Sequence, residues 1–202
     1  MLNDNMSAQQ WVAKVNQLID SQDWTGLESM NQQVCQRLVD RKDMNSLVDF
    51  YEQAFELVAG AVKVDHLSTD DLKVLGSDLQ FVLTNALSQS AVDPDIKAIY
   101  LEYHYDGGDS TELNLFLSEK HPDEDTECWG SYFGDNGFIE GPNVHHLFHF
   151  DPDGELSDLE VTIATECVRA HLITVLMSVI DGLKPDVPVG FAAHDGFVVM
   201  LN

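Results

Sequence analysis

The apolar residues of this 202-residue chain change their spacing at Asp93-Pro94. Before this dipeptide they recur three or four positions apart, as on one face of a helix, and after it they alternate with polar residues, as in a strand. Ser7, Asp23 and Thr69 precede helical stretches and are residue types that cap helix N-termini. The sequence therefore predicts about four helices in residues 1–92, connected by short loops.

The strongest strand signal lies in residues 99–118. Leu101, Tyr103 and Tyr105 fall on one face of a first strand, and leucines alternate with other residues in 113–118. The acidic, glycine-rich segment between the two strands is typical of a hairpin turn. Further strands are expected at residues 129–133, 138–139, 144–150, 189–193 and 197–201. Together they predict a mostly antiparallel sheet of five to six strands.

Residues 157–182 predict one long helix that is apolar on almost all sides. A helix with so little polar surface is covered by other elements, so we expect it to be buried and to organise the core. It precedes a C-terminal β-hairpin. The predicted fold class is α+β, with an N-terminal helical layer in residues 1–92 and the sheet and long helix in residues 93–202. We expect these regions to form one compact unit.

Acidic residues outnumber basic residues by 35 to 10, which gives a formal net charge of −25. Such a charge repels nucleic acid and anionic lipid, and it leaves basic proteins, cations or no partner at all. A hydrophobic content of 44% shows that the acids have not replaced the core. The acids therefore either keep a solvated surface soluble or form a face that binds a basic partner.

Three cysteines, Cys35, Cys128 and Cys167, lie far apart and form no Cys-x-x-Cys motif. This pattern is no disulfide framework and fits a reducing compartment. The N-terminal residues show no apolar leader segment, and the longest apolar stretch, residues 170–180, is too short to cross a bilayer. We therefore expect a cytoplasmic protein that binds no membrane.

The segment from His149 to Glu160 carries a candidate cation site. Read as a twelve-position loop, it has acids at the third, fifth and seventh positions, glycine at the sixth and glutamate at the twelfth, and it resembles an EF-hand calcium loop. The candidate ligands are Asp151, Asp153, Glu155 and Glu160. The alternative reading needs no calcium: Asp-Pro-Asp-Gly makes a tight turn, and Ser157 with Glu160 makes a capping box.

No nucleophile-elbow, zinc-protease or phosphate-loop motif is present, so we expect a protein without enzymatic activity. The first hypothesis is an acidic interaction module that binds a basic partner protein, for example as an immunity protein binds a toxin. The predicted contact residues combine rings and acids of the later half: Tyr103, Tyr105, Asp106, Asp109, Asp123, Glu124, Asp125 and Trp129. The alternatives are a nucleic-acid mimic and a divalent-cation enzyme or sensor that uses Asp151–Glu160. No direct nucleic-acid binding is expected, and homo-oligomer formation is left open.

Overall fold

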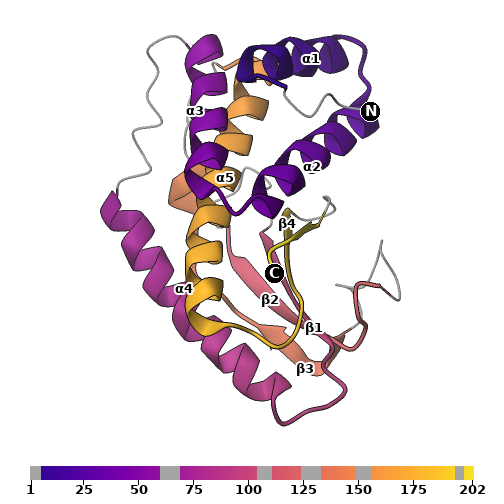
Figure 1. Ribbon diagram of the computed structural model, residues 1–202, viewed down its shortest axis with the longest axis vertical. Coiled ribbons are helices and arrows are strands. Elements are labelled where there is room, and N and C mark those ends of the chain that lie inside the picture. The colour runs from indigo at the N-terminus through magenta and orange to yellow at the C-terminus, as the bar shows by residue number, and fades with distance from the viewer. Residues whose placement is uncertain (1–5, 60–68, 104–110, 124–132, 149–155, 194–197) are drawn as a thin grey trace. The chain divides into compact units, whose positions relative to one another are not determined.

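The computed structural model describes residues 6–59, 69–103, 111–123, 133–148, 156–193 and 198–202 (Figure 1). The chain divides into two compact units. Unit 1 comprises residues 1–67 and 147–174, and unit 2 comprises residues 68–146 and 175–202. The division does not follow the predicted boundary near residue 93, because the fourth helix groups with the sheet and the long helix contributes to each unit. That the chain forms one compact unit stays a prediction.

Unit 1 is helical, as predicted. Its elements are α1 (Ala8–Asp20), α2 (Trp24–Asp40), α3 (Met44–Ala59) and the first part of α5 (Asp158–Leu183). The helices α1, α2 and α3 contact one another. Two predicted caps are confirmed: the Ser7 hydroxyl accepts a hydrogen bond from the Gln10 N–H, and the Asp23 carboxylate accepts one from the Gly26 N–H. These bonds satisfy backbone donors that a helix start leaves without a partner.

Unit 2 combines α4 (Thr69–Ser90) and the end of α5 with a five-stranded sheet of order β3-β2-β1-β4-β5. The strands are β1 (Ala98–Tyr103), β2 (Leu113–Ser118), β3 (Phe133–Ile139), β4 (Val189–Ala193) and β5 (Val199–Met200). The β1–β4 pair is parallel and the other three pairs are antiparallel. The predicted α+β class is confirmed, including the long helix before a C-terminal antiparallel pair.

The long helix α5 is buried along most of its length, as predicted. Its length and apolar composition would also suit a membrane span, and 67% of its most apolar window is buried inside the structure. Because the core helix of a globular protein has the same properties, this feature is weak evidence for a membrane.

The segment predicted as a strand at residues 144–150 is different in the structure. His145–Phe148 form a short 3₁₀ helix, η2. The Asn143 side chain accepts a hydrogen bond from the His145 N–H and turns the chain. Val144, Leu147 and Phe148 are buried, and their spacing of three and four residues suits a helical turn better than a strand.

The segment of β3 was also predicted differently. Its glycines, Gly134 and Gly137, suggested a turn between two strands, but the structure has one continuous strand over Phe133–Ile139. Its register against β2 shifts between Phe116 and Ser118, and the chain bends sharply within the strand, since a Cβ on Gly137 would lie 2.7 Å from that of Phe133. The final strand is shorter than predicted, since β5 covers Val199–Met200; residue 197 lies outside the described residues.

Gly141 packs against the backbone of β2. A Cβ atom at this position would overlap with the carbonyl oxygen of Leu113. We expect Gly141→Ala to lower the free energy of unfolding by about 1–3 kcal/mol, because backbone has to move to relieve the overlap. Gly182→Ala is the matched control, since a Cβ there meets nothing within 4 Å, and it should be neutral or mildly stabilising. Urea unfolding of both variants checks this, and equal stability would contradict the close contact.

Candidate functional site

The sheet of unit 2 has two faces of different chemistry, because successive side chains of a strand point to opposite sides. One face carries aliphatic and aromatic residues that are fully buried. They are Ile99, Leu101, Tyr103, Leu113, Leu115, Leu117, Val189, Phe191 and Val199. Helix α4 contacts β2, and Gln89 of α4 lines a pocket together with Leu117. We call this side the helix face.

The opposite face, which we call the aromatic face, carries a row of side chains that crosses the sheet. Phe138 pairs with Phe116, and Phe116 pairs with Tyr100. Beyond Tyr100 the row continues through Gly190 to Met200. The Phe116 ring lies 5.6 Å from that of Phe138, 6.0 Å from that of Tyr100 and 4.8 Å from that of Phe133, between centroids. Tyr100, Phe116, Phe133 and Phe138 form the aromatic cluster.

The aromatic cluster is open to solvent at its β3 end. The side chain of Phe138 is 50% exposed and that of Phe133 is 41% exposed, whereas Tyr100 is 7% exposed. Phe116 is partly buried against Ala98, Tyr100 and Ala192. A rigid group of rings that is exposed at one end resembles the anchoring centre of a protein interface more than an ordinary core.

A row of acidic and amide side chains runs beside the aromatic row. Glu102 pairs with Asn114 across β1 and β2 and lies on the same face as Tyr100. Glu140 follows β3 two residues after Phe138, and the Asn114 side chain accepts a hydrogen bond of 3.3 Å from the next N–H, that of Gly141. Two residues of a strand span about 6.6 Å, so the Glu102 residue lies about this far along β1 from Tyr100 on the same face. The aromatic face thus offers apolar contact and negative charge together.

Of the residues predicted to contact a partner, the structure describes Tyr103 and Asp123. Tyr103 is on the helix face, 1% exposed and stacked on Phe191 with ring centroids 5.6 Å apart, so it cannot serve as the exposed anchor that we expected. The reason is that Tyr103 lies two positions after Leu101 and therefore shares its buried face of the strand. Asp123 is exposed, and its carboxylate lies 3.4 Å from the His121 ring. The other predicted contacts lie outside the described residues and stay predictions: Tyr105, Asp106, Asp109, Glu124, Asp125 and Trp129.

The acidic and aromatic residues of the open face were not among the predicted contacts. Phe116 carried a signal, because it alternates with the buried leucines of β2 and so points to the opposite side. Glu102 carried the same signal in β1. Phe138 and Glu140 had no local signal, since the irregular register of β3 decides which side they occupy.

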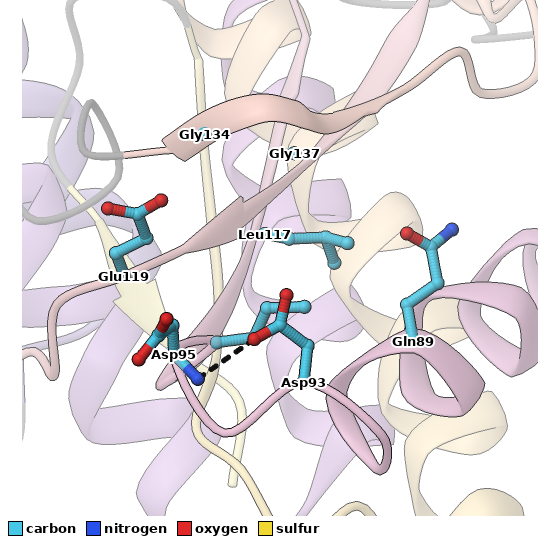
Figure 2. A pocket seen from close by; sticks show the side chains of 8 residues that line it. Gln89, Asp93, Asp95, Leu117, Glu119, Gly134 and Gly137 are labelled. Carbon is cyan, nitrogen blue, oxygen red and sulfur yellow. Dashed lines mark hydrogen bonds between the residues drawn. The ribbon is translucent and has the colours of Figure 1, made fainter.

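A pocket of about 240 Å³ lies on the other side of β3, on the helix face (Figure 2). Gly134 and Gly137 leave space beside Leu117, and Asp93, Asp95 and Glu119 surround the opening. The Asp95 N–H donates a 3.0 Å hydrogen bond to the Asp93 carboxylate, which fixes the loop after α4. Within the described residues, no group of three or more His, Cys, Asp and Glu is arranged to hold a metal ion, so we assign no metal here.

Of the predicted calcium ligands, the structure describes Glu160. Its carboxylate accepts hydrogen bonds of 2.8 Å from the Ser157 N–H and 2.7 Å from the Ser157 hydroxyl. The Glu160 N–H donates back to the same hydroxyl, so the predicted capping box is confirmed. These bonds lower the pKa of Glu160. Asp151, Asp153 and Glu155 lie outside the described residues, and calcium binding stays a prediction.

Unit 1 contains a buried polar network that joins three of its helices. The Trp11 indole N–H donates to the Asn31 side chain at 3.2 Å, and the Asn31 amide donates to Glu166 at 3.2 Å. Arg169 approaches the Glu166 carboxylate at 2.9 Å. All four side chains are buried. We call Trp11, Asn31, Glu166 and Arg169 the buried network.

The surroundings of the buried network disfavour charge. Burial raises the pKa of Glu166, and the Arg169 guanidinium and the Asn31 hydrogen bond oppose this shift. Burial also raises the pKa of Cys35 to about 12 and that of Tyr51 well above its usual value. Because the thiolate is the reactive form of cysteine, Cys35 is a poor nucleophile. The network fits a structural role.

The other described cysteine also behaves as a core residue. Burial raises the pKa of Cys167 to about 12, as its apolar neighbours in the sequence led us to expect. His171 lies 3.3 Å from Glu52, but burial has the larger influence and lowers the pKa of the imidazole. A neutral imidazole holds its partner by a hydrogen bond more than by charge.

The sequence matches no protein-family model, and neither a curated protein nor a solved structure is significantly similar to the chain.

Proposed function

We propose that the protein is a binding module that docks a basic partner protein on the aromatic face of its sheet. The observation that carries the proposal is the register of β1, β2 and β3. It sets Phe138, Phe116 and Tyr100 in one row and places Glu102 one step from Tyr100 on the same side, and Glu140 follows Phe138 by two residues in the sequence. Aromatic residues are enriched at the centres of specific interfaces, and polar or charged residues form the rim around them.

The charge of the whole chain supports a basic partner. A net charge of −25 attracts cationic proteins over distances of about 10 Å at moderate salt and raises their association rate. Charge alone gives little specificity, because it acts on every cationic surface alike. The half-exposed rings supply short-range contact that a correctly shaped partner alone can bury. An immunity protein that occupies a basic toxin is one form of such a module.

The proposal is tested by retention of basic proteins from a lysate of the source cells on immobilised wild-type protein and on Phe138→Ser. We expect wild type to retain a basic protein at low salt and to release it as salt rises. Phe138→Ser should reduce the affinity for that purified partner about tenfold, since losing a central anchor costs more than 1 kcal/mol.

Phe81→Ser is the matched control. Phe81 is 77% exposed on α4 in the same unit, so its loss changes surface hydrophobicity equally without touching the aromatic face. It should bind like wild type. Equal loss of affinity in both variants, or binding that Phe138→Ser leaves unchanged, would contradict docking on this face. Binding that does not respond to salt would contradict the electrostatic part.

A further inference from the structure

We infer that the aromatic face selects arginine over lysine in the segment that it binds; this inference rests on the proposed function. Its basis is the position of Glu140 relative to Phe138. Phe138 lies near the end of β3 and Glu140 is the first residue after that strand, so one position separates the two residues, and both are exposed. Phe116 packs beside Phe138, with ring centroids 5.6 Å apart, and holds that ring in place.

A half-exposed ring beside a carboxylate fits the guanidinium group well. The guanidinium is flat, so it can stack on the face of a ring, and its N–H donors point outward in its own plane toward a neighbouring acid. Because only Ile139 separates Glu140 from Phe138, the exposed Glu140 side chain is close enough along the chain to approach a guanidinium that covers Phe138. Stacking and a charge-assisted hydrogen bond can then form together.

A lysine side chain gains less from a ring and a neighbouring carboxylate than an arginine side chain does. Its ammonium group is compact and strongly hydrated, and it has no flat surface to lay on a ring. Phenylalanine offers it no hydrogen-bond acceptor in return. A lysine side chain can pair with Glu140 in solvent, and exposed pairs of that kind contribute little to affinity. The ring therefore distinguishes between two side chains of equal charge.

The second half of the face repeats the arrangement with less exposure. Glu102 lies two residues after Tyr100 on β1, on the same side, and Asn114 stands between Glu102 and the β3 edge. Tyr100 is 7% exposed, so its ring offers little surface for stacking. Selection for arginine should consequently depend on Phe138 more than on Tyr100.

The test compares two short cationic peptides that differ only in having arginine or lysine at every basic position. Their binding to the full-length protein is measured by fluorescence anisotropy at low salt. The net charge of −25 attracts both peptides equally, so the ratio of the two dissociation constants reports on stacking. We expect the arginine peptide to bind about two- to fivefold more tightly for each stacked side chain.

Phe138→Leu keeps an apolar side chain but removes the ring. It should bring the ratio close to one, because it weakens binding of the arginine peptide more than binding of the lysine peptide. Glu140→Gln should weaken the arginine peptide more than the lysine peptide. Phe81→Leu and Asp78→Asn, both on exposed positions of α4, are matched controls and should keep the wild-type ratio.

The outcomes separate the two proposals. If neither peptide binds, the proposed docking function fails together with this inference. If both peptides bind with equal affinity, docking of a basic partner stands and selection for arginine is overturned. If Phe138→Leu keeps the wild-type preference for arginine, the selection does not reside in this ring, and the inference is likewise overturned.

Discussion

Replacing Glu166 by leucine is expected to lower the free energy of unfolding by about 3–5 kcal/mol. The change removes the carboxylate that lies 2.9 Å from the Arg169 guanidinium, and the buried positive charge loses this interaction. It also takes away the acceptor of the Asn31 amide. Urea unfolding followed by circular dichroism gives the loss directly.

The double variant Glu166→Leu with Arg169→Met is the control for this interpretation. It removes both charges and replaces them with apolar side chains, so most of the lost stability should return. If the double variant is as unstable as Glu166→Leu alone, the loss of stability comes from altered packing and not from the buried charge of Arg169.

The same glutamate should leave a signature in the pH dependence. Burial raises the pKa of Glu166 above the value of 4.5 expected for an unfolded chain, so the folded state holds this proton more tightly. Its contribution to stability is therefore fully present below that value and is lost as pH rises through the raised folded pKa. The stability of wild type relative to Glu166→Gln should fall across this interval. A difference that rises with pH would contradict the direction of the shift.

The second large effect is expected at Trp11. Its side chain is fully buried and makes edge contacts with Phe50 and Tyr51, at centroid distances of 5.9 and 5.2 Å. Trp11→Ala should lower the free energy of unfolding by about 3–5 kcal/mol, because it leaves a large cavity. It also removes the donor that Asn31 uses. Denaturant unfolding measures the loss.

Trp24 provides a matched control in the same unit. It is 51% exposed, and we expect Trp24→Ala to change stability by about 0.5 kcal/mol or less. Trp11→Phe keeps ring contacts and loses the indole N–H, so it should lie between the two alanine variants. A Trp11→Ala protein as stable as Trp24→Ala would show that α1 does not anchor unit 1 in this way.

The parts of the fold that depend on neighbouring residues were predictable. Helix starts at Ser7 and Asp23 and the capping box of Ser157 were recognised because the interacting groups lie within three positions of one another. The strands β1 and β2 were recognised from their alternation. The strand prediction for residues 144–150 was wrong, because a few apolar residues between polar ones suit a strand and a helical turn almost equally.

The candidate site depends on residues that meet from separate strands. The excess of acid was visible in the sequence, but the neighbours of each acid follow from the strand register. Phe116 faces Phe138 only because β3 pairs with β2 in one irregular register, and a shift by one residue would turn Phe138 to the other face. Helix α4 belongs to the same compact unit as the sheet, and this grouping depends on contacts between residues far apart in the sequence, which a local sequence pattern does not predict.

The parallel pairing of β1 with β4 has a consequence for how the sheet assembles. Ile99 faces Val189, so the middle of the sheet closes only after a long stretch of intervening chain has been brought back. In a chain in which β1, β2 and β3 have paired before β4 arrives, β1 is an edge strand with amide and carbonyl groups that lack strand partners along one side. Such an edge invites pairing with another unfinished copy. Each copy carries a charge of −25, so incompletely folded copies repel one another. This repulsion opposes the pairing of their exposed strand edges, and the carboxylates therefore also reduce aggregation during folding.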